Sequence, residues 1–128
     1  MDIHKALLER FNFKEFRNYN GEPLQENAAR AAVEGKSLLA VFPTGGGKSV
    51  TFQLPALMAG KSAHALTVVI SPLQSLMKDQ VDNLSAKGVV DAVTINGALS
   101  PVERAKAMER VANGMASLLY ISPESLLL

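Results

Sequence analysis

The sequence predicts an α/β fold in which a parallel sheet carries helices on both faces. Short apolar runs alternate along the chain with longer amphipathic stretches, and this order is typical of parallel strands joined by crossover helices. A glycine-rich run also follows the first apolar run and precedes a helical stretch. The chain has 128 residues, of which 48% are hydrophobic, and this length and composition fit one globular domain.

The amino-terminal part contains two predicted helices and the first predicted strand. One helix covers residues 1–10, a loop covers residues 18–24, and the second helix runs from about residue 25 to residue 33 and stops at Gly35. The apolar run at residues 37–42 (SLLAVF) is too short for a typical globular helix. We therefore predict that it is a buried strand.

The next helix is predicted from about residue 48 to residue 58, with Gly60 as its stop signal. Proline lacks the amide hydrogen that a helix interior uses, so we expect Pro55 to kink this helix or end it early. The remaining elements are predicted in the order strand, helix, strand, helix, strand, and they cover residues 66–70, 73–86, 89–95, 101–112 and 117–121.

Serine and proline recur where predicted strands pass into helices, at residues 71–72 and 122–123. Serine as N-cap followed by proline in the first helical turn fits both places. Residues 71–74 and 100–103 also match the capping box, in which two side chains satisfy amide groups at a helix start. Capping is the simpler interpretation. The alternative is a ligand role, because helix amino termini at the carboxyl ends of parallel strands face the ligand side of such sheets.

The glycine-rich run has the composition of a phosphate-binding loop. It reads Phe42-Pro43-Thr44-Gly45-Gly46-Gly47-Lys48-Ser49. Three glycines let the backbone approach an anion closely, and their amide groups at a helix start form an anion-binding nest. Lys48 is expected to reach the β- and γ-phosphates, and Ser49 to place its hydroxyl on a magnesium ion. Phe42 stands where the strict motif has its first glycine. We predict ATP or GTP binding, and a glycine-rich hinge is the alternative.

Charge, cysteine content and apolar runs limit the kinds of site and location that we expect for this chain. Thirteen basic and twelve acidic side chains give a net charge of +1, which neither supports nor excludes DNA binding. The chain has no cysteine, and His4 and His64 are far apart in sequence, so we predict no thiolate metal site. Signal-like and membrane-spanning apolar runs are also missing, and we expect a cytosolic protein that does not enter membranes.

Four blocks of the sequence carry a resemblance to a known family. The blocks are residues 43–49 (PTGGGKS), 52–57 (FQLPAL), 70–81 (ISPLQSLMKDQV) and 120–126 (YISPESL). In their order and spacing they resemble the RecQ family of DNA helicases, and the resemblance runs from about Phe11 to the last residue. This resemblance implies the amino-terminal portion of a RecA-like motor domain, part of a P-loop NTPase. In that family ATP hydrolysis drives 3′-to-5′ movement on single-stranded DNA.

The resemblance also implies roles for individual residues. Residues 1–34 would hold the amino-terminal helices and an adenine-reading motif, and residues 35–128 the α/β core. Phe16-Arg17 and Gln25 match the ends of the adenine motif, although the spacer between them is longer than in the family. The implied nucleotide contacts are Arg17, Gln25, Thr44, Gly45, Gly46, Gly47, Lys48 and Ser49, with Ser49 on Mg²⁺. The implied DNA contacts are Ser71, Pro72, Gln74, Lys78, Ser122, Pro123 and Glu124.

Two parts of the family's motor are not found in this sequence: the acidic D-E-x-H run and the second RecA-like domain. We therefore expect a truncated motor domain that binds nucleotide but neither hydrolyses it efficiently nor unwinds DNA. The expected partners are single-stranded or partly duplex DNA, the remainder of the motor, and a second copy held by exposed apolar sheet edges. The parent protein would be nucleoid-associated in a prokaryote or nuclear in a eukaryote.

Two other functions share some of these features. A P-loop nucleotide kinase or small-molecule kinase would have the same phosphate loop, but it would not need the block at residues 70–81. A non-catalytic nucleotide-binding module is the second alternative. The aromatic residues Phe11, Phe13 and Phe16 are interleaved with Lys14 and Arg17. Such residues could stack on bases, but we interpret them as hydrophobic anchors of the amino-terminal helices.

Overall fold

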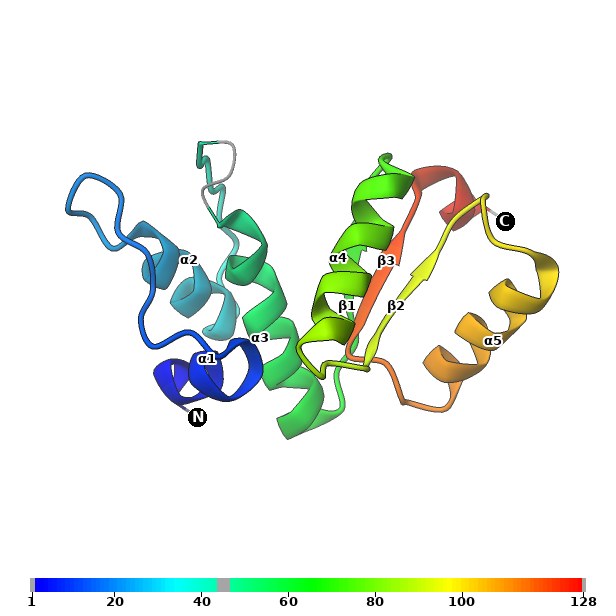
Figure 1. Cartoon of the computed structure of the whole chain (residues 1–128), viewed down its shortest axis with the longest axis horizontal. Helices are drawn as coiled ribbons and strands as arrows, with labels where there is room; N and C mark the ends of the chain where they lie inside the picture. The colour runs from blue at the N-terminus through cyan, green and yellow to red at the C-terminus, as the bar shows by residue number, and fades with distance from the viewer. Residues whose placement is uncertain (1, 44–46, 128) are drawn as a thin grey trace. The chain divides into compact units, whose positions relative to one another are not determined.

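A computed structural model describes residues 2–43 and 47–127 of the chain, and its elements are labelled in Figure 1. The chain divides into two compact units, Met1–Ala59 and Gly60–Leu128, which we describe separately. The helices are α1 (Ile3–Phe11), α2 (Leu24–Val33), α3 (Lys48–Ala63), α4 (Gln74–Ala86) and α5 (Pro101–Ala112), with a short 3-10 helix η1 (Pro123–Leu127). The strands are β1 (Thr67–Ile70), β2 (Ala92–Ile95) and β3 (Leu118–Ile121). None of the helices in the described ranges has the length and apolar composition that crossing a membrane requires.

Helix α1 has a capped start and one apolar face. The side chain of Asp2 accepts a hydrogen bond from the amide of His4, which satisfies an amide group of the first turn. At the other end Asn12 adopts a left-handed conformation, and its amide donates to the carbonyl of Leu8. The buried side chains recur at helical spacing, at positions 3, 6, 7 and 11. The predicted helix at residues 1–10 is therefore confirmed to within two residues.

Helix α3 is longer than we predicted, because neither Pro55 nor Gly60 ends it. Pro55 removes one backbone hydrogen bond, but its neighbours Leu54 and Ala56 are fully buried, and their packing holds the helix on both sides of it. A Cβ atom on Gly60 would lie 2.0 Å from the Oγ of Ser117. Gly60 therefore permits close packing within the second unit and is not a stop signal.

The predicted strand at residues 37–42 is wrong. The structure assigns no strand to this segment and pairs β1, β2 and β3 only with one another. Leu39 and Val41 are 90% and 81% exposed. A strand forms only where another strand satisfies its backbone groups, and among the described residues this segment has no such neighbour. The apolar composition alone could not reveal this.

The second unit contains the predicted parallel sheet, with the strand order β1-β3-β2. Leu119 is level with Val68 on one side and with Val93 on the other, and both pairings are parallel. Strand β2 starts at Ala92, three residues later than predicted, because residues 89–91 form the connection that follows Gly88. The other two strands match their predicted ranges to within one residue.

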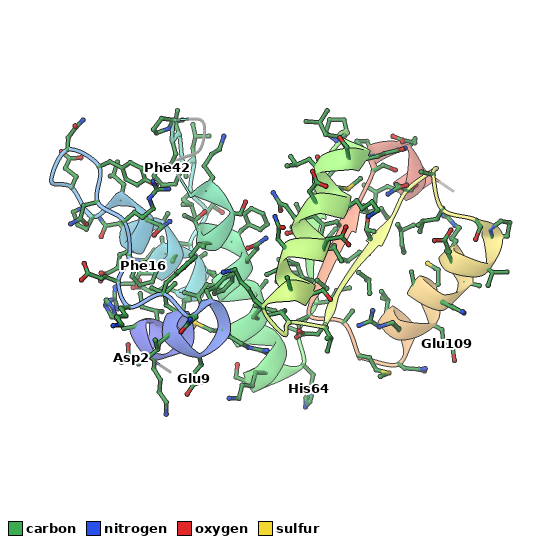
Figure 2. The ribbon with its side chains drawn as sticks, viewed as in Figure 1. Asp2, Glu9, Phe16, Phe42, His64 and Glu109 are labelled. Atoms are coloured by element: carbon green, nitrogen blue, oxygen red, sulfur yellow. The ribbon has the colours of Figure 1, made fainter. Side chains whose placement is uncertain are left out.

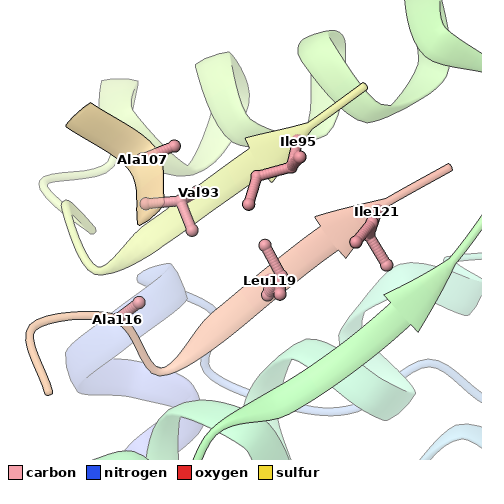
Figure 3. Close-up of a cluster of buried hydrophobic side chains, with 6 residues drawn as sticks. All are labelled: Val93, Ile95, Ala107, Ala116, Leu119 and Ile121. Atoms are coloured by element: carbon pink, nitrogen blue, oxygen red, sulfur yellow. The ribbon is translucent and has the colours of Figure 1, made fainter. Parts of the chain in front are cut away.

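Helices cover both faces of this sheet. Ala107 of α5 belongs to a buried cluster with Val93 and Ile95 of β2 and Leu119 and Ile121 of β3 (Figure 3). Side chains alternate between the two faces of a strand, so Thr94 points to the opposite face. Thr94 lines a hollow together with residues of α4, which places α4 on that face. The predicted fold class, a parallel sheet with helices on both faces, is therefore confirmed.

The serine caps have different outcomes. Ser100 and Glu103 form the predicted capping box: the amide of Glu103 donates to Ser100 Oγ at 3.1 Å, and the amide of Ser100 donates to Glu103 Oε1 at 2.9 Å. The predicted box at residues 71–74 is wrong. Helix α4 begins only at Gln74, and Ser71 Oγ accepts from the amide of Leu73 at 3.2 Å in a local turn. Two residues, Pro72 and Leu73, separate the serine from the start of the helix.

Candidate functional site

Gln25 connects two distant segments of the first unit. The amide of Arg17 donates to Gln25 Oε1 at 2.8 Å, and Gln25 Nε2 donates to the carbonyl of Gly47 at 2.9 Å. The side chain is only 4% exposed. A buried amide group without partners is unfavourable, so these two hydrogen bonds explain why a polar side chain is stable here. They bring the predicted adenine motif into contact with the end of the glycine run.

Gly47 must be glycine for two independent reasons. Its φ of +79° lies in the left-handed region, which side chains with a Cβ rarely adopt. A Cβ atom would also lie 2.6 Å from Gln25 Nε2. The third glycine of the run is therefore required by the fold of the first unit. Thr44, Gly45 and Gly46, which we also predicted as nucleotide contacts, lie outside the described residues.

A pocket of about 510 Å³ brings several of the predicted nucleotide residues together. Its lining contains two basic side chains and one acidic side chain. The amino-terminal end of α3 adds partial positive charge, because its first amide groups point out of the helix. The pocket is therefore suited to an anionic ligand. The lining residues are Asn12, Phe13, Lys14, Glu15, Arg17, Gln25, Gly47, Ser49 and Val50.

Phe13 is one of the pocket residues that sequence analysis did not predict as a nucleotide contact, together with Asn12, Lys14, Glu15 and Val50. Phe11 and Phe16 are buried, as expected for hydrophobic anchors, and Phe16, labelled in Figure 2, also makes an edge contact with the ring of His4. Phe13 is 42% exposed and lines the pocket, with its ring stacked on Phe11 at 6.1 Å. The only signal in the sequence was its place between basic residues, which also fits a hydrophobic anchor.

The residues present fit a nucleotide better than they fit a metal ion held by the protein alone. The pocket has the volume of a small-molecule site, and it combines an exposed ring, an amide side chain and basic groups. No cluster of three histidine or acidic side chains that could hold a metal occurs within residues 2–43 and 47–127. The hydroxyl of Ser49 remains the predicted contact for Mg²⁺, with phosphate oxygens as the other ligands. Lys48 begins α3 and is exposed.

Gln74 and Lys78, two of the predicted DNA contacts, lie together in the second unit. They line a hollow of about 510 Å³ with Thr94 and Asn96, and with Glu103 from the start of α5. The ammonium group of Lys78 donates to Asp82 at 2.7 Å, and this hydrogen bond raises the pKa of Lys78. Asp82 also lines the hollow, so the described acidic groups here outnumber the basic one.

The two Ser-Pro turns lie beside each other at one edge of the sheet. Ser71 follows β1 and Ser122 follows β3, and the amide of Ser71 donates to the carbonyl of Ile121 at 3.1 Å. Ser122 is fully buried, and its hydroxyl donates to Ser125 Oγ at 2.8 Å. Pro72, Pro123 and Glu124 are exposed. The structure thus brings together the predicted DNA residues of two blocks, but it turns the Ser122 side chain inward.

Residues 22–128 match the family model of the DEAD/DEAH box helicases. The chain belongs to this family. The match covers the second unit, with its parallel sheet, and the pocket residues Gln25, Gly47, Ser49 and Val50, while the pocket residues at positions 12–17 precede it.

Several relatives of this DEAD/DEAH box chain are named ATP-dependent DNA helicase RecQ, and the predicted resemblance is confirmed. The chain is 39% identical over 123 residues to the ATP-dependent helicase SGS1 of Saccharomyces cerevisiae, and the aligned region covers 96% of this chain and 8% of that protein. It is 39% identical over 117 residues to the ATP-dependent DNA helicase RecQ of Haemophilus influenzae, with 91% of this chain and 17% of that protein covered. It is 40% identical over 128 residues to the Bacillus subtilis RecQ, with 97% of this chain and 20% of that protein covered. The chain spans a fifth or less of the length of these three relatives.

Proposed function

We propose that this chain is the ATP-binding part of a RecQ-type DNA helicase, whose parent protein couples ATP hydrolysis to 3′-to-5′ movement on DNA and to its unwinding. The pocket of the first unit is the observation that carries the proposal. It joins Arg17 and Gln25 of the adenine motif with Gly47 and Ser49 of the phosphate loop. The names of the relatives, all ATP-dependent helicases, support the same conclusion.

Gln25 can read adenine without giving up its two backbone partners. An amide side chain has two donor hydrogens and two acceptor lone pairs, and the structure uses one of each, for Gly47 and Arg17. One donor and one acceptor remain. They match the ring nitrogen and the exocyclic amino group on one edge of adenine. We place the base beside this amide group and against the ring of Phe13, which is exposed and lines the same pocket.

The phosphates extend from the base toward the start of α3. We assign them to Thr44, Gly45, Gly46 and Gly47 through backbone amide groups, and to Lys48 through its side chain. Ser49 would hold a Mg²⁺ ion that neutralises charge on the phosphates. The residues of this chain thus bind and orient the nucleotide, and we propose that the chain alone does so without efficient turnover. Residues 1–128 would then be one partial RecA-like domain of the parent protein.

DNA would contact the second unit at the edge formed by Ser71, Pro72, Gln74, Lys78, Ser122, Pro123 and Glu124. Lys78 is the main basic group of this set, and a DNA phosphate must compete with Asp82 for it. We therefore propose weak, salt-dependent binding of single-stranded or partly duplex DNA. For single strands, the logarithm of the binding constant should fall with the logarithm of the salt concentration, with a slope of about −0.7 per phosphate neutralised. The parent protein would act where DNA is found, in the nucleoid region of a prokaryotic cytoplasm or in a nucleus.

Calorimetric titration of Mg-ATP into the chain tests the nucleotide proposal. We expect saturable binding that Lys48→Ala abolishes or weakens at least about tenfold, because the lysine supplies the point charge on the phosphates. Lys36→Ala is the matched control: it removes a lysine of the same unit whose ammonium group pairs with Glu34. Equal affinity for wild type and Lys48→Ala, or no binding by the wild type, would overturn the proposal for this chain.

A further inference from the structure

A tight turn in the long spacer of the adenine motif contacts the start of the phosphate loop. Tyr19 and Glu22 form an isolated antiparallel bridge, with both amide-to-carbonyl hydrogen bonds at 2.9 Å. Asn20 and Gly21 between them have φ angles of +51° and +81°. Asparagine followed by glycine, both with positive φ, is the preferred sequence of a two-residue hairpin turn. The spacer is therefore an ordered hairpin, and it fixes the position of the Tyr19 side chain.

The ring of Tyr19 stacks on the ring of Phe42, which is labelled in Figure 2. The ring centroids are 5.1 Å apart and the planes differ by 19°. Phe42 is the residue directly before the loop that begins at Pro43. The hydroxyl of Tyr19 is buried and has no hydrogen-bond partner among the described residues. A buried hydroxyl without a partner is unfavourable, so ring stacking, and not a hydrogen bond of the hydroxyl, holds the Tyr19 ring against Phe42.

The same short segment also holds the far end of the loop. Gln25 donates to the carbonyl of Gly47, which directly precedes the start of α3. Residues 19–25 thus make one contact before the loop, at Phe42, and one at its end, at Gly47. We infer that Tyr19 is a positioning residue for nucleotide binding: it holds the start of the phosphate loop by stacking on Phe42, while Gln25 holds the other end. This inference rests on the proposed function of the pocket and deepens it.

The expected effect follows from preorganisation. A loop held at both ends loses less conformational freedom when it closes around phosphates, so less of the binding energy is used to order it. Phe42 also fills the place at which the strict motif has a glycine. Loss of a stacked aromatic pair should weaken nucleotide binding by about threefold to tenfold.

The test compares Tyr19→Ala with Tyr19→Phe, using Mg-ATP and inorganic tripolyphosphate with Mg²⁺ as the two probes. Tyr19→Ala removes the ring, whereas Tyr19→Phe keeps it and removes only the unpaired hydroxyl. We expect Tyr19→Ala to lower the affinity for both probes by the same factor. Tyr19→Phe should bind both probes with affinities within about twofold of those of the wild type. Phe42→Ala should have the same effect as Tyr19→Ala, and the double variant should lose no more than either single variant.

A second measurement decides the inference without any nucleotide. Amide ¹⁵N relaxation of the free chain should show a lower order parameter at Phe42 in Tyr19→Ala, recovery in Tyr19→Phe, and no change at Ile121 in the second unit. If the wild type binds neither probe, the proposed function fails, and the order parameter at Phe42 alone decides whether Tyr19 holds the loop. An unchanged order parameter, unchanged affinities in Tyr19→Ala, or weakening of Mg-ATP alone would overturn the inference.

Discussion

Different kinds of interaction stabilise each of the two units of this chain. In the second unit a three-stranded parallel ladder fixes the backbone, and α4 and α5 cover its two faces. In the first unit the described residues contain no such ladder, and single side-chain contacts from Tyr19 and Gln25 hold the segments around the pocket. Each ladder hydrogen bond is supported by its neighbours, whereas a single contact has no substitute. We therefore expect the scaffold to tolerate most single changes and the pocket to depend on a few residues.

The largest effect on stability is expected at Gly60, where a side chain would disturb the packing of the second unit. Alanine is the better helix former by about 1 kcal/mol, so Gly60→Ala would stabilise an exposed helix. Here the new Cβ atom would lie 2.0 Å from Ser117 Oγ and 2.4 Å from Ser117 Cβ. We expect a net loss of about 1–3 kcal/mol in the free energy of unfolding, measured with urea. Gly60→Ala combined with Ser117→Gly should recover part of it; a stabilised single variant would contradict the close packing.

Gly47→Ala tests the first unit in the same way. Positive φ costs about 1 kcal/mol for a residue with a Cβ, and the new atom would displace the Gln25 side chain. We expect Mg-ATP binding to weaken by about tenfold or more, while the melting of the second unit changes little. Calorimetry and hydrogen exchange of the strands measure the two effects. Unchanged affinity would show that the Gln25 contact with Gly47 does not matter for the nucleotide.

The capping box of α5 should have an intermediate effect. Ser100→Ala removes the side chain that accepts from Glu103 and should cost about 1 kcal/mol of stability. The amide of Ser100 donates to Glu103 and holds the pKa of that carboxyl below its usual 4.5. A carboxyl with a lowered folded pKa stabilises the fold above its unfolded pKa, and this contribution is lost as the pH falls through the folded value.

The difference in unfolding free energy between wild type and Glu103→Ala should therefore be constant near neutral pH and shrink below about pH 4.5. Urea titrations at several pH values measure it, and the comparison between variants cancels the other carboxyl groups. A difference that stays constant as the pH falls would show that the capping bond does not involve the carboxylate.

The smallest effect is expected for the Lys78–Asp82 pair, because exposed ion pairs contribute at most about 1 kcal/mol. Asp82→Asn should raise the affinity of the chain for single-stranded DNA about twofold to fivefold at low salt, because a phosphate no longer competes with the carboxylate for Lys78. Asp79→Asn is the matched control: it changes the net charge equally and leaves the hydrogen bond between Lys78 and Asp82 in place. Equal gains in both variants would show that only net charge matters.

A second copy of the chain is the occupant we propose for the uncovered side of β1. Val68 and Ile70 are 47% and 58% exposed, and their partners in register, Leu119 and Ile121, are buried on the same face. An apolar edge strand of this kind favours association. Size-exclusion chromatography should show a concentration-dependent dimer, and a monomer at all concentrations would count against it.

The sequence predicted the second unit well because its signals are local and agree with one another. Apolar runs, helix stop signals and the capping box at Ser100 all point to the same elements. It failed at residues 37–42 and at Gly60, where the outcome depends on which segment lies beside the residue, and at the capping box of residues 71–74, where the helix starts only at Gln74. The motif spacing named the residues that meet in the pocket, but it did not show that Phe13 is exposed there.

By itself, then, the sequence determined the fold class and the family and predicted the phosphate loop, because periodicity and motif spacing are properties of consecutive residues. Only the tertiary structure decided that Gln25 holds Gly47, that Tyr19 stacks on Phe42, and that Gly60 must leave room for Ser117. These contacts join residues that are at least 22 positions apart. Their formation depends on distances that the folded backbone sets, and no local pattern in the chain encodes those distances.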